Sequence, residues 1–429
     1  MKKKIIALML VAAMSAAMFA GCGNNKTEKN NSDGSEKTAS SEEQVDITYW
    51  TLGTRQESME QIVSEFNEEY PNINIIFSYY DTDAIKDACK VAAQADNLPD
   101  MWYNWGGSLG AYYPQNGCSK DLTEYAAANG WDEKFNSGAL SLCELGGQLS
   151  GYPIAYNVVG MFYRKDIFQE YGIEVPTTFE QFEQACATLK KNGVTPISTG
   201  GLYGWHTMRL VEQFVEYYAG ADGHDELNSF DSSWDQENVI KALAKYQEFC
   251  EKGYFPEGFI TSDPNDTLIS LANGNCAMDI QGQWYDFNIL DNDLDMDQYG
   301  WFPFPNETGR MSAFTEMVQF NADMDDAKLD ACMKFMDFME TEEHAAADLV
   351  NNPLPFANAV MPGDERPHVS EMYEYSNEGG TFTITDQAFP TAVADVLFDG
   401  QAGICNGTET PEKVAAAIQS AIEEYKSAE

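Results

Sequence analysis

Hydrophobic and polar positions follow two different periods along the chain, and each period predicts one kind of element. Residues 45–50 alternate apolar with polar side chains and are rich in β-branched and aromatic residues, which predicts a strand. Further strands are predicted at residues 73–80, 100–105 and 158–163. Residues 58–70 instead place apolar side chains three and four positions apart, which is the period of a helix. We expect helices at residues 58–70, 83–94, 178–191, 208–218, 236–252, 327–339 and 411–427.

Strands and helices alternate in this prediction. Such alternation indicates an α/β fold, in which mostly parallel sheets are covered by helices on both faces. Ligands of these folds bind outside the carboxyl ends of the strands. Residues that directly follow a predicted strand are therefore the first candidates for a binding site.

The first residues of the chain form a separate segment. Three lysines, Lys2 to Lys4, precede an apolar run at residues 5–19. This run is shorter than the about 20 residues of a spanning helix, and it is typical of a signal peptide. Small residues then stand directly before Cys22, which resembles the lipobox of bacterial lipoproteins. The resemblance implies a signal peptide at residues 1–21 and a lipid on the Cys22 thiol, whereas an ordinary secretory signal with a chance cysteine is the alternative.

Residues 22–44 contain no aromatic side chain and no aliphatic one larger than alanine. A segment of this composition cannot bury a core, so we expect a flexible tether. With a lipid on Cys22, the tether would hold a folded body at the outer face of the cytoplasmic membrane.

Charge and aromatic content narrow the range of partners. The chain has 25 Lys and Arg against 69 Asp and Glu, a formal net charge of −44. A surface this acidic repels nucleic acids, so we expect no nucleic-acid partner. With 8 Trp and 22 Tyr, the composition favours an uncharged or cationic ligand over a phosphate or a nucleotide.

The sequence offers no spacing typical of a metal or cofactor site. The cysteines after Cys22 are scattered without a CxxC pair, and no HExxH motif or P-loop is present. We therefore expect no metal, no cofactor and no catalytic residue. Whether the cysteines form disulfides is left open, because their connectivity cannot be read from one sequence.

Two local motifs were weighed against their context. Residues 106–110 fit G-x-S-x-G, the nucleophile elbow of serine hydrolases, but Pro114 and Gly117 shorten the helix that the elbow needs. Four aspartates at residues 291–297 resemble an EF-hand loop. Met296 stands where that loop needs Gly and Phe302 where it needs Glu, so a solvated acidic loop is the preferred interpretation, with a looser cation site as the alternative.

Four segments, in order and over most of the chain, resemble the sugar-binding solute-binding lipoproteins of bacterial ABC importers, the maltose-binding type. They are LPDMW at 98–102 with NWGG at 104–107, GYPIAYN at 151–157 leading into FYRKDIF at 162–168, GNCAMDIQGQW at 274–284, and NNPLP at 351–355. The resemblance implies two α/β lobes joined by crossing strands, which close on a sugar in the cleft between them. It implies lobe one at residues 45–155 plus 316–365, and lobe two at 156–315 plus 366–429.

The same resemblance implies a monomer that delivers its sugar to a membrane permease with a partner ATPase. Elementary chemistry agrees with a sugar, because aromatic rings cover its C–H faces and amides or carboxylates meet its hydroxyls. The candidate ligand-binding residues follow predicted strands or match binding positions of the family. They are Trp50, Thr51, Arg55, Asp81, Asn104, Trp105, Asn157, Trp205, His206, Trp284 and Phe389.

Two other functions stay open at this stage. One is a receptor of the same fold for a peptide or a cation, which the excess of acidic residues would suit. The other is a surface glycoside hydrolase, because 69 acidic residues always supply carboxylate pairs. No pair of carboxylates stands out in the sequence.

Overall fold

The structure is a computed structural model, and it describes residues 44–341, 344, 355–357, 361–363 and 365–428. The predicted signal peptide at 1–21, Cys22, the tether up to residue 43 and residues 351–354 of the NNPLP segment lie outside the described residues.

The strands lie close to where the sequence predicts them, with several additions. They are β1 (Val45–Leu52), β2 (Ile73–Tyr80), β3 (Met101–Trp105), β4 (Glu144–Leu145), β5 (Gln148–Leu149), β6 (Tyr152–Arg164), β7 (Thr195–Ser198), β8 (Cys276–Gly282), β9 (Tyr299–Phe302), β10 (Met311–Phe320) and β11 (Thr381–Thr383).

Seven of the helices match predicted helices, with ends that differ by a few residues, except that the helix predicted at 208–218 continues ten residues further, to Asn228. The helices are α1 (Gln56–Glu69), α2 (Thr82–Gln94), α3 (Ser108–Gln115), α4 (Thr123–Ala128), α5 (Trp131–Lys134), α6 (Ser137–Ser141), α7 (Lys165–Tyr171), α8 (Phe179–Lys191), α9 (Trp205–Asn228), α10 (Glu237–Glu251), α11 (Thr267–Ala272), α12 (Tyr285–Asp291), α13 (Asp326–Met339), α15 (Pro367–Gly379), α16 (Thr385–Ala388), α17 (Thr391–Cys405) and α18 (Pro411–Ala428). Within the described residues, none of them combines the length and the apolar character that crossing a membrane requires.

One mixed sheet of nine strands organises residues 44–428, in the order β2-β1-β3-β10-β6-β8-β7, with β11 beside β10 and β9 beside β6. Strands at the two ends pair in parallel, as β1 does with β2 and β7 with β8. The two long central strands pair mostly antiparallel, because β10 pairs with both β3 and β6 in that sense and β6 does so with β8. The short strand β11 is the exception, because it pairs with β10 in parallel. The α/β fold class is confirmed, and the sheet mixes parallel with antiparallel pairs.

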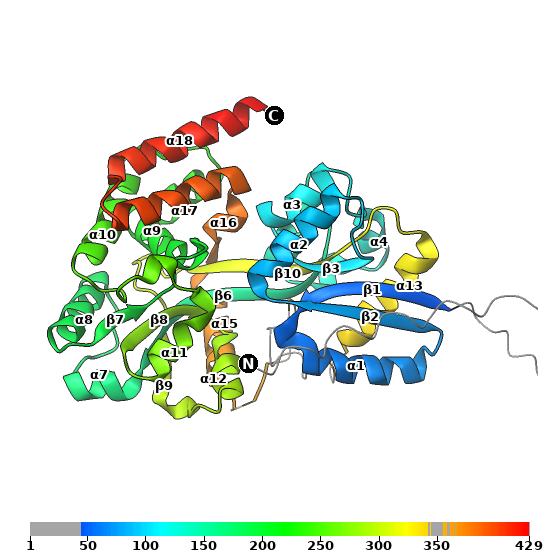
Figure 1. Ribbon diagram of the computed structural model, residues 1–429, viewed down its shortest axis with the longest axis horizontal. Helices are drawn as coiled ribbons and strands as arrows, with labels where there is room; N and C mark the ends of the chain where they lie inside the picture. The colour runs from blue at the N-terminus through cyan, green and yellow to red at the C-terminus, as the bar shows by residue number, and fades with distance from the viewer. Residues whose placement is uncertain (1–43, 342–343, 345–354, 358–360, 364, 429) are drawn as a thin grey trace, which may run out of the picture. The chain divides into compact units, whose positions relative to one another are not determined.

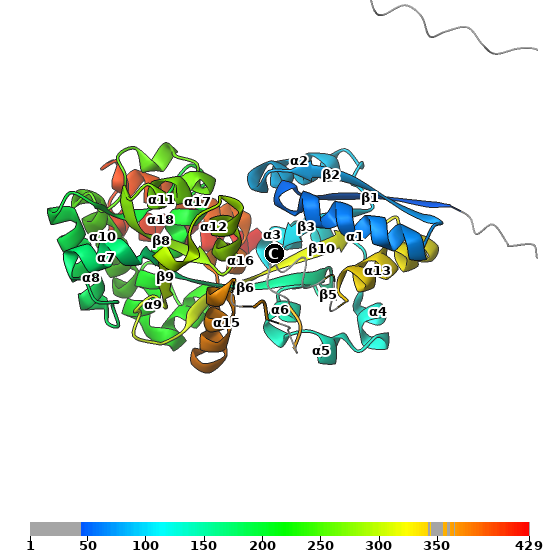
Figure 2. The same ribbon diagram turned by 90° about the horizontal axis from the view of Figure 1, so that it is seen from below.

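Helices gather around the two ends of this sheet, and β6 and β10 run between the two groups (Figure 1). The N-terminal group consists of β1 to β5 with α1 to α6 and α13. The C-terminal group consists of β7 to β9 with α7 to α12 and α15 to α18, and Figure 2 shows the same division from below. The chain passes into the C-terminal group along β6 and returns along β10.

Aromatic packing fixes the helices on the sheet. In the N-terminal group, the ring of Phe66 on α1 meets that of Phe335 on α13 edge to face at 5.3 Å, and Tyr49 of β1 meets Phe335 at 6.4 Å. In the C-terminal group, Phe182 of α8 packs on Phe304 at 4.9 Å, again edge to face. Such pairs are favourable beyond their buried area, so aromatic contacts stabilise the packing of helices in both groups.

A disulfide ties two late helices together. Cys250 at the end of α10 is bonded to Cys405 at the end of α17, and the two cysteines are 155 positions apart in sequence. Six other cysteines in the described part of the chain are free thiols. Five of these are buried, and burial raises the pKa of the Cys143 thiol well above its usual value.

Candidate functional site

A cavity of about 180 Å³ lies where the N-terminal and C-terminal groups meet. Both groups line it, since Thr82 of α2 contributes from one side and Arg209 of α9 from the other. Its wall is rich in aromatic side chains. They are Tyr103, Trp105, Trp205, Trp284, Tyr285, Phe287 and Phe314.

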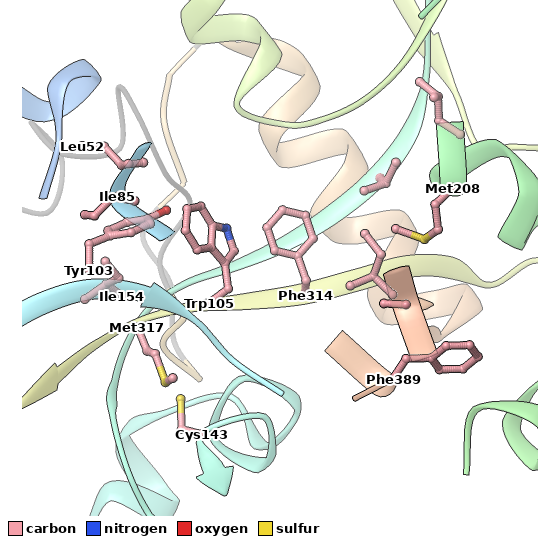
Figure 3. Close-up of a cluster of buried hydrophobic side chains, with 14 of the residues drawn as sticks. Leu52, Ile85, Tyr103, Trp105, Cys143, Ile154, Met208, Phe314, Met317 and Phe389 are labelled. Atoms are coloured by element: carbon pink, nitrogen blue, oxygen red, sulfur yellow. The ribbon is translucent and has the colours of Figure 1, made fainter. Parts of the chain in front are cut away.

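Three tryptophans reach the cavity from three separate elements. Trp105 is the last residue of β3, Trp205 is the first residue of α9, and Trp284 stands between β8 and α12. Such strand ends and helix starts are where α/β folds place their ligands. Figure 3 shows Trp105 beside Tyr103 of the same strand, with Phe314 of β10 across from its indole. All three tryptophans were predicted as ligand-binding residues, and the structure brings them to one cavity.

The position of Trp284 depends on a close approach to the backbone. Its ring lies over Gly282, the last residue of β8, and a Cβ at Gly282 would stand 1.8 Å from Cζ3 of the indole. Only glycine leaves that space free. The ring also packs edge to face on Phe314, with centroids 5.5 Å apart.

Cations accompany the tryptophans. The guanidinium carbon of Arg209 lies 4.7 Å from the ring centroid of Trp205 and 5.0 Å from that of Trp284. The Lys86 Nζ of α2 lies 4.7 Å from the ring centroid of Trp105 and 5.9 Å from that of Trp205. These distances are within the range of cation–π attraction, so each indole has a positive charge near it.

Polar side chains complete the wall. Asn265, Gln281 and Asn288 line the cavity, together with one carboxylate, Glu316 of β10, and one guanidinium, Arg209. Amides both donate and accept hydrogen bonds, and a carboxylate accepts them. The lining therefore offers aromatic faces and hydrogen-bonding groups of both kinds, with one charge of each sign.

A buried polar network supports this wall from behind. The hydroxyl of Tyr285 donates to Asp279 Oδ2 at 2.7 Å, and His206 Nε2 lies 3.2 Å from Asp279 Oδ1 and 3.1 Å from the carbonyl oxygen of Ile280. The Gly200 amide donates to His206 Nδ1 at 3.3 Å, so the ring proton is on Nε2. His206 is fully buried, and the structure places it in this network instead of on the cavity wall.

Four other predicted residues are buried away from the cavity. The Asn104 amide donates to Gln319 Oε1 at 2.7 Å and its own oxygen accepts from the Trp105 amide at 2.9 Å, so this side chain fixes the backbone beside Trp105. Thr51, Arg55 and Asn157 have no exposed surface. The strand positions of Thr51 and Asn157 explain this, because β1 and β6 are covered at those points.

The remaining three predicted residues also lie outside the cavity lining. Phe389 is fully buried and packs on Phe230 and Trp234, with ring centroids at 5.1 and 4.9 Å, so it belongs to the core of the C-terminal group. Trp50 packs on Tyr80 at 5.2 Å. Asp81 is exposed at the start of α2. A sequence motif places a residue after a strand, but it does not say which way its side chain points.

The sequence analysis missed several lining residues. Arg209 follows Trp205 by four positions, which places both on one face of a helix, and this spacing was the available signal. Tyr103 and Phe314 stand inside strands that are buried along their whole length. Nothing in the sequence separates such residues from ordinary core.

The two rejected local motifs have structural roles. Ser108 Oγ donates to the backbone oxygen of Asp386 at 2.8 Å, and α3 ends at Gln115, as the proline predicted. Asp295 caps a short turn by accepting from the amide of Asp297. Among the residues that the structure describes, no group of three His, Cys, Asp or Glu side chains could hold a metal ion.

Sequence and fold comparisons agree with this architecture. Residues 50–346 match the profile of the family described as bacterial extracellular solute-binding protein. An ABC transporter extracellular-binding protein of Pyrococcus horikoshii is 26% identical over 313 residues, 70% of either chain. The galactooligosaccharide-binding protein of Bacillus subtilis is 23% identical over 397 residues, 88% of this chain and 87% of its own. The solved structure of a chitin oligosaccharide binding protein has the same fold, with a TM-score of 0.81 and 22% identity over 89% of this chain and 98% of the other.

Proposed function

We propose a function that starts from family membership: the chain belongs to the bacterial extracellular solute-binding proteins. In our proposal it is the substrate-binding component of an ABC importer, and it captures a carbohydrate, in particular an oligosaccharide, outside the cytoplasm. One observation carries the choice of ligand, which is the convergence of Trp105, Trp205 and Trp284 on one cavity. Relatives named for sugars, such as the galactooligosaccharide-binding protein, support it.

The chemistry of the cavity favours a sugar over the other ligand classes. Indole rings cover the C–H faces of a pyranose, which are apolar. Amides and the two charged groups meet its hydroxyls, each of which both donates and accepts. A peptide or a polyamine would bring its cationic groups close to the guanidinium of Arg209, which is buried in the wall and would repel them. We therefore place the peptide or cation receptor second.

Closure of two lobes around the sugar would couple binding to delivery. We propose lobe one at residues 45–155 plus 316–365 and lobe two at 156–315 plus 366–429, with β6 and β10 as the crossing strands. A sugar that contacts both lobes favours the closed state by its differential affinity. The closed form would then dock on the permease, whose ATPase supplies the energy. In this scheme the protein is a monomer and breaks no bond, so no residue is assigned a catalytic role.

A fluorescence titration tests the proposal. Residues 45–429 are titrated with maltotriose, raffinose, xylotriose, galactobiose and N,N′-diacetylchitobiose, with tryptophan emission as the signal. We expect a saturable change at micromolar or tighter concentration for one sugar, and recovery of that sugar intact. Release of shorter products would favour a glycoside hydrolase. A response to oligopeptides or polyamines, with none to any sugar, would overturn the choice of ligand.

Variants then test the site. Trp105→Ala and Trp284→Ala should each weaken binding of the titrating sugar by about 1–3 kcal/mol, the scale of a lost aromatic contact. Trp301→Ala is the matched control, because Trp301 packs on Tyr375 and does not line the cavity. Unchanged affinity in both cavity variants would contradict the assignment of this site.

The anchor is a separate part of the proposal. We propose that Cys22 carries lipid and holds the protein at the outer face of the cytoplasmic membrane, as the small residues before it suggest. A Cys22→Ser variant expressed in a bacterial host should leave the membrane fraction, while wild type stays in it. Mass spectrometry of the mature N-terminus gives the second measurement, and an unmodified Cys22 would contradict lipidation.

A further inference from the structure

Arg209 occupies an unusual place in the cavity wall. It stands one helical turn after Trp205 on α9, so both side chains project from the same face of the helix. Its guanidinium carbon lies over the indole rings of both Trp205 and Trp284, at 4.7 and 5.0 Å from their centroids. Only 8% of the residue is exposed, yet it lines the cavity. Two aromatic rings therefore accompany a charged, planar group at the wall.

The hydrogen bonds of Arg209 are incomplete. A guanidinium has five N–H donors, and Nη1 donates to Gln281 Oε1 at 3.1 Å. Among the described residues, the buried Nε of Arg209 has no hydrogen-bond partner, and the same holds for the buried indole Nε1 of neighbouring Trp205. Buried donors are normally satisfied, and an unsatisfied one is costly. Two such donors on adjacent side chains of one cavity wall indicate that a ligand supplies the acceptors.

The charged groups near Arg209 indicate whether the acceptor atoms of the ligand are charged or uncharged. Glu316 lines the same cavity, so a ligand carboxylate would meet a negative charge there. Burial lowers the pKa of Arg209 to about 10, while Asp386, Glu212, Asp279 and Glu316 act in the opposite direction. The guanidinium thus stays charged at neutral pH and already faces several carboxyl groups. Uncharged oxygens, such as those of two neighbouring hydroxyls, satisfy the donors without adding to this negative charge.

We propose that Arg209 is a ligand-binding residue that donates hydrogen bonds to a pair of adjacent hydroxyls on an uncharged sugar ring, which Trp205 and Trp284 flank. This inference rests on the proposed function and adds to it the side chain that recognises two hydroxyls of the sugar. Contact with the two indoles restricts the guanidinium, and its fork of N–H groups selects two oxygens at a fixed spacing. Sugars that lack either hydroxyl, or that carry a carboxylate there, bind more weakly.

A paired series of ligands and variants tests the assignment. The ligand probes are the panel sugar that titrates the wild-type protein, each of its monodeoxy derivatives and its uronic acid form. The protein variants are Arg209→Met, which keeps most of the bulk, and Arg209→Lys, which keeps the charge without the planar fork. Lys241→Met, an exposed cation on α10 outside the cavity, is the control. Circular dichroism and thermal unfolding of each variant verify that it is folded.

We expect the effect of removing a hydroxyl from the sugar to depend on the residue at position 209. In wild type, removal of one of two adjacent hydroxyls should weaken binding by about 10- to 100-fold, the scale of a buried donor left without its acceptor. Against Arg209→Met, the same deoxy sugar should bind no more weakly than the parent sugar. Arg209→Lys should resemble the Met variant, and Lys241→Met should resemble wild type. A side chain that only supported the fold would weaken all the sugars by one common factor.

Three results would overturn the inference, and they are distinguishable. If every deoxy sugar loses the same factor in Arg209→Met as in wild type, Arg209 contacts no hydroxyl, while the proposed function stands. If the uronic acid binds wild type more tightly than the parent sugar and loses this gain in Arg209→Met, the acceptor is a carboxylate. If no sugar binds the wild-type protein, the proposed function is contradicted. This inference is then contradicted as well, because it depends on the proposed function.

Discussion

The indole of Trp284 occupies the space above Gly282, where any larger residue would place its Cβ. One glycine therefore determines where an aromatic face of the cavity stands. The two residues belong to the IQGQW end of the motif at 274–284, which served above only as part of a family resemblance. At the scale of single residues, the structure shows that Gly282 and Trp284 of this motif pack against each other, and a substitution can test this contact.

We expect Gly282→Ala to displace the ring of Trp284 and to weaken sugar binding by about 1–3 kcal/mol, as Trp284→Ala does. The displacement follows because a contact of 1.8 Å to Cζ3 cannot be accommodated without movement of the ring. Titration of both variants with the same sugar measures the effect. Gly363→Ala is the control, because its Cβ would meet no atom of the described residues within 4 Å. Wild-type affinity in Gly282→Ala would mean that the indole is not needed at this place.

At the scale of elements, α9 carries two glutamates one turn apart whose carboxyl groups have opposite pKa shifts. Burial raises the pKa of Glu212 from its ordinary 4.5 to about 8, although Thr385 donates to it from its amide and its hydroxyl. Burial acts on Glu216 in the same direction, but hydrogen bonds from His224, Arg310 and Thr308 outweigh it and lower its pKa to about 2. The hydrogen-bond partners set the sign of each pKa shift, and those of Glu216 come from α9 itself, through His224, and from the segment before β10, through Thr308 and Arg310.

Glu212 should make the protein less stable as the pH rises from 5 to 8. An acid whose pKa is higher in the folded state binds its proton more tightly there, so its contribution is complete below about pH 4.5 and is lost toward pH 8. A Glu212→Gln variant does not titrate. Its free energy of unfolding, relative to wild type, should therefore rise by about 2–4 kcal/mol over this range.

Urea unfolding at pH 5 and pH 8 measures this difference. Glu251→Gln, an exposed glutamate at the end of α10, is the control and should show the same difference from wild type at both values. A Glu212→Gln difference that is also independent of pH would contradict the raised pKa.

The disulfide between α10 and α17 is a second feature at this scale. It closes a loop of 155 residues, which restricts the unfolded chain strongly. We expect Cys250→Ser with Cys405→Ser to lower the free energy of unfolding by about 2–5 kcal/mol. Urea unfolding with and without dithiothreitol gives the measurement, because reduction should affect wild type and leave the double variant unchanged. Equal stability of wild type and the double variant in oxidising buffer would contradict a structural bond.

At the scale of the whole folded body, Lys86 links the two groups of elements. Its ammonium lies near Trp105 in the N-terminal group and Trp205 in the C-terminal group. We expect Lys86→Met to shift the unliganded protein toward an open form by roughly two- to fivefold, the scale of one cation–π contact. Small-angle X-ray scattering should then show a larger radius of gyration without sugar and the wild-type value with saturating sugar. An unchanged radius without sugar would mean that this contact does not hold the groups together.

Sequence reasoning predicted the β2-β1-β3 end of the sheet better than its centre. Strands β1 and β2 and most long helices alternate or repeat with a clear period, because one face is exposed or meets a different neighbour. Strand β10 and the first half of β6 are buried along almost their whole length. A strand buried on both faces has no alternation to detect, and β10 even contains Glu316 and Gln319. Of the two crossing strands, sequence reasoning therefore predicted only residues 158–163 of β6 and nothing of β10.

The candidate site likewise contains some residues that the sequence predicted and others that it did not. The three tryptophans were predicted because they are rare, large and placed at the ends of motifs, and all three line the cavity. Arg209 was missed because an arginine on a helix is normally exposed, and only the packing of two indoles explains its burial. Binding roles for Trp50, Thr51, Arg55, Asp81, Asn104, Asn157, His206 and Phe389 stay predictions, and the structure places these residues outside the cavity lining.

The order of strands across the sheet has a consequence for how the protein is made. Strand β10 pairs with β3 on one side and β6 on the other, although it follows both by more than 140 residues. A chain that emerges from a ribosome or a translocation channel N-terminus first must wait for residues 311–320 before this central gap is filled. Until then β3 and β6 each present an unpaired edge, which is a hazard for aggregation. The nascent chain would therefore benefit from a holding chaperone until about three quarters of its length has appeared.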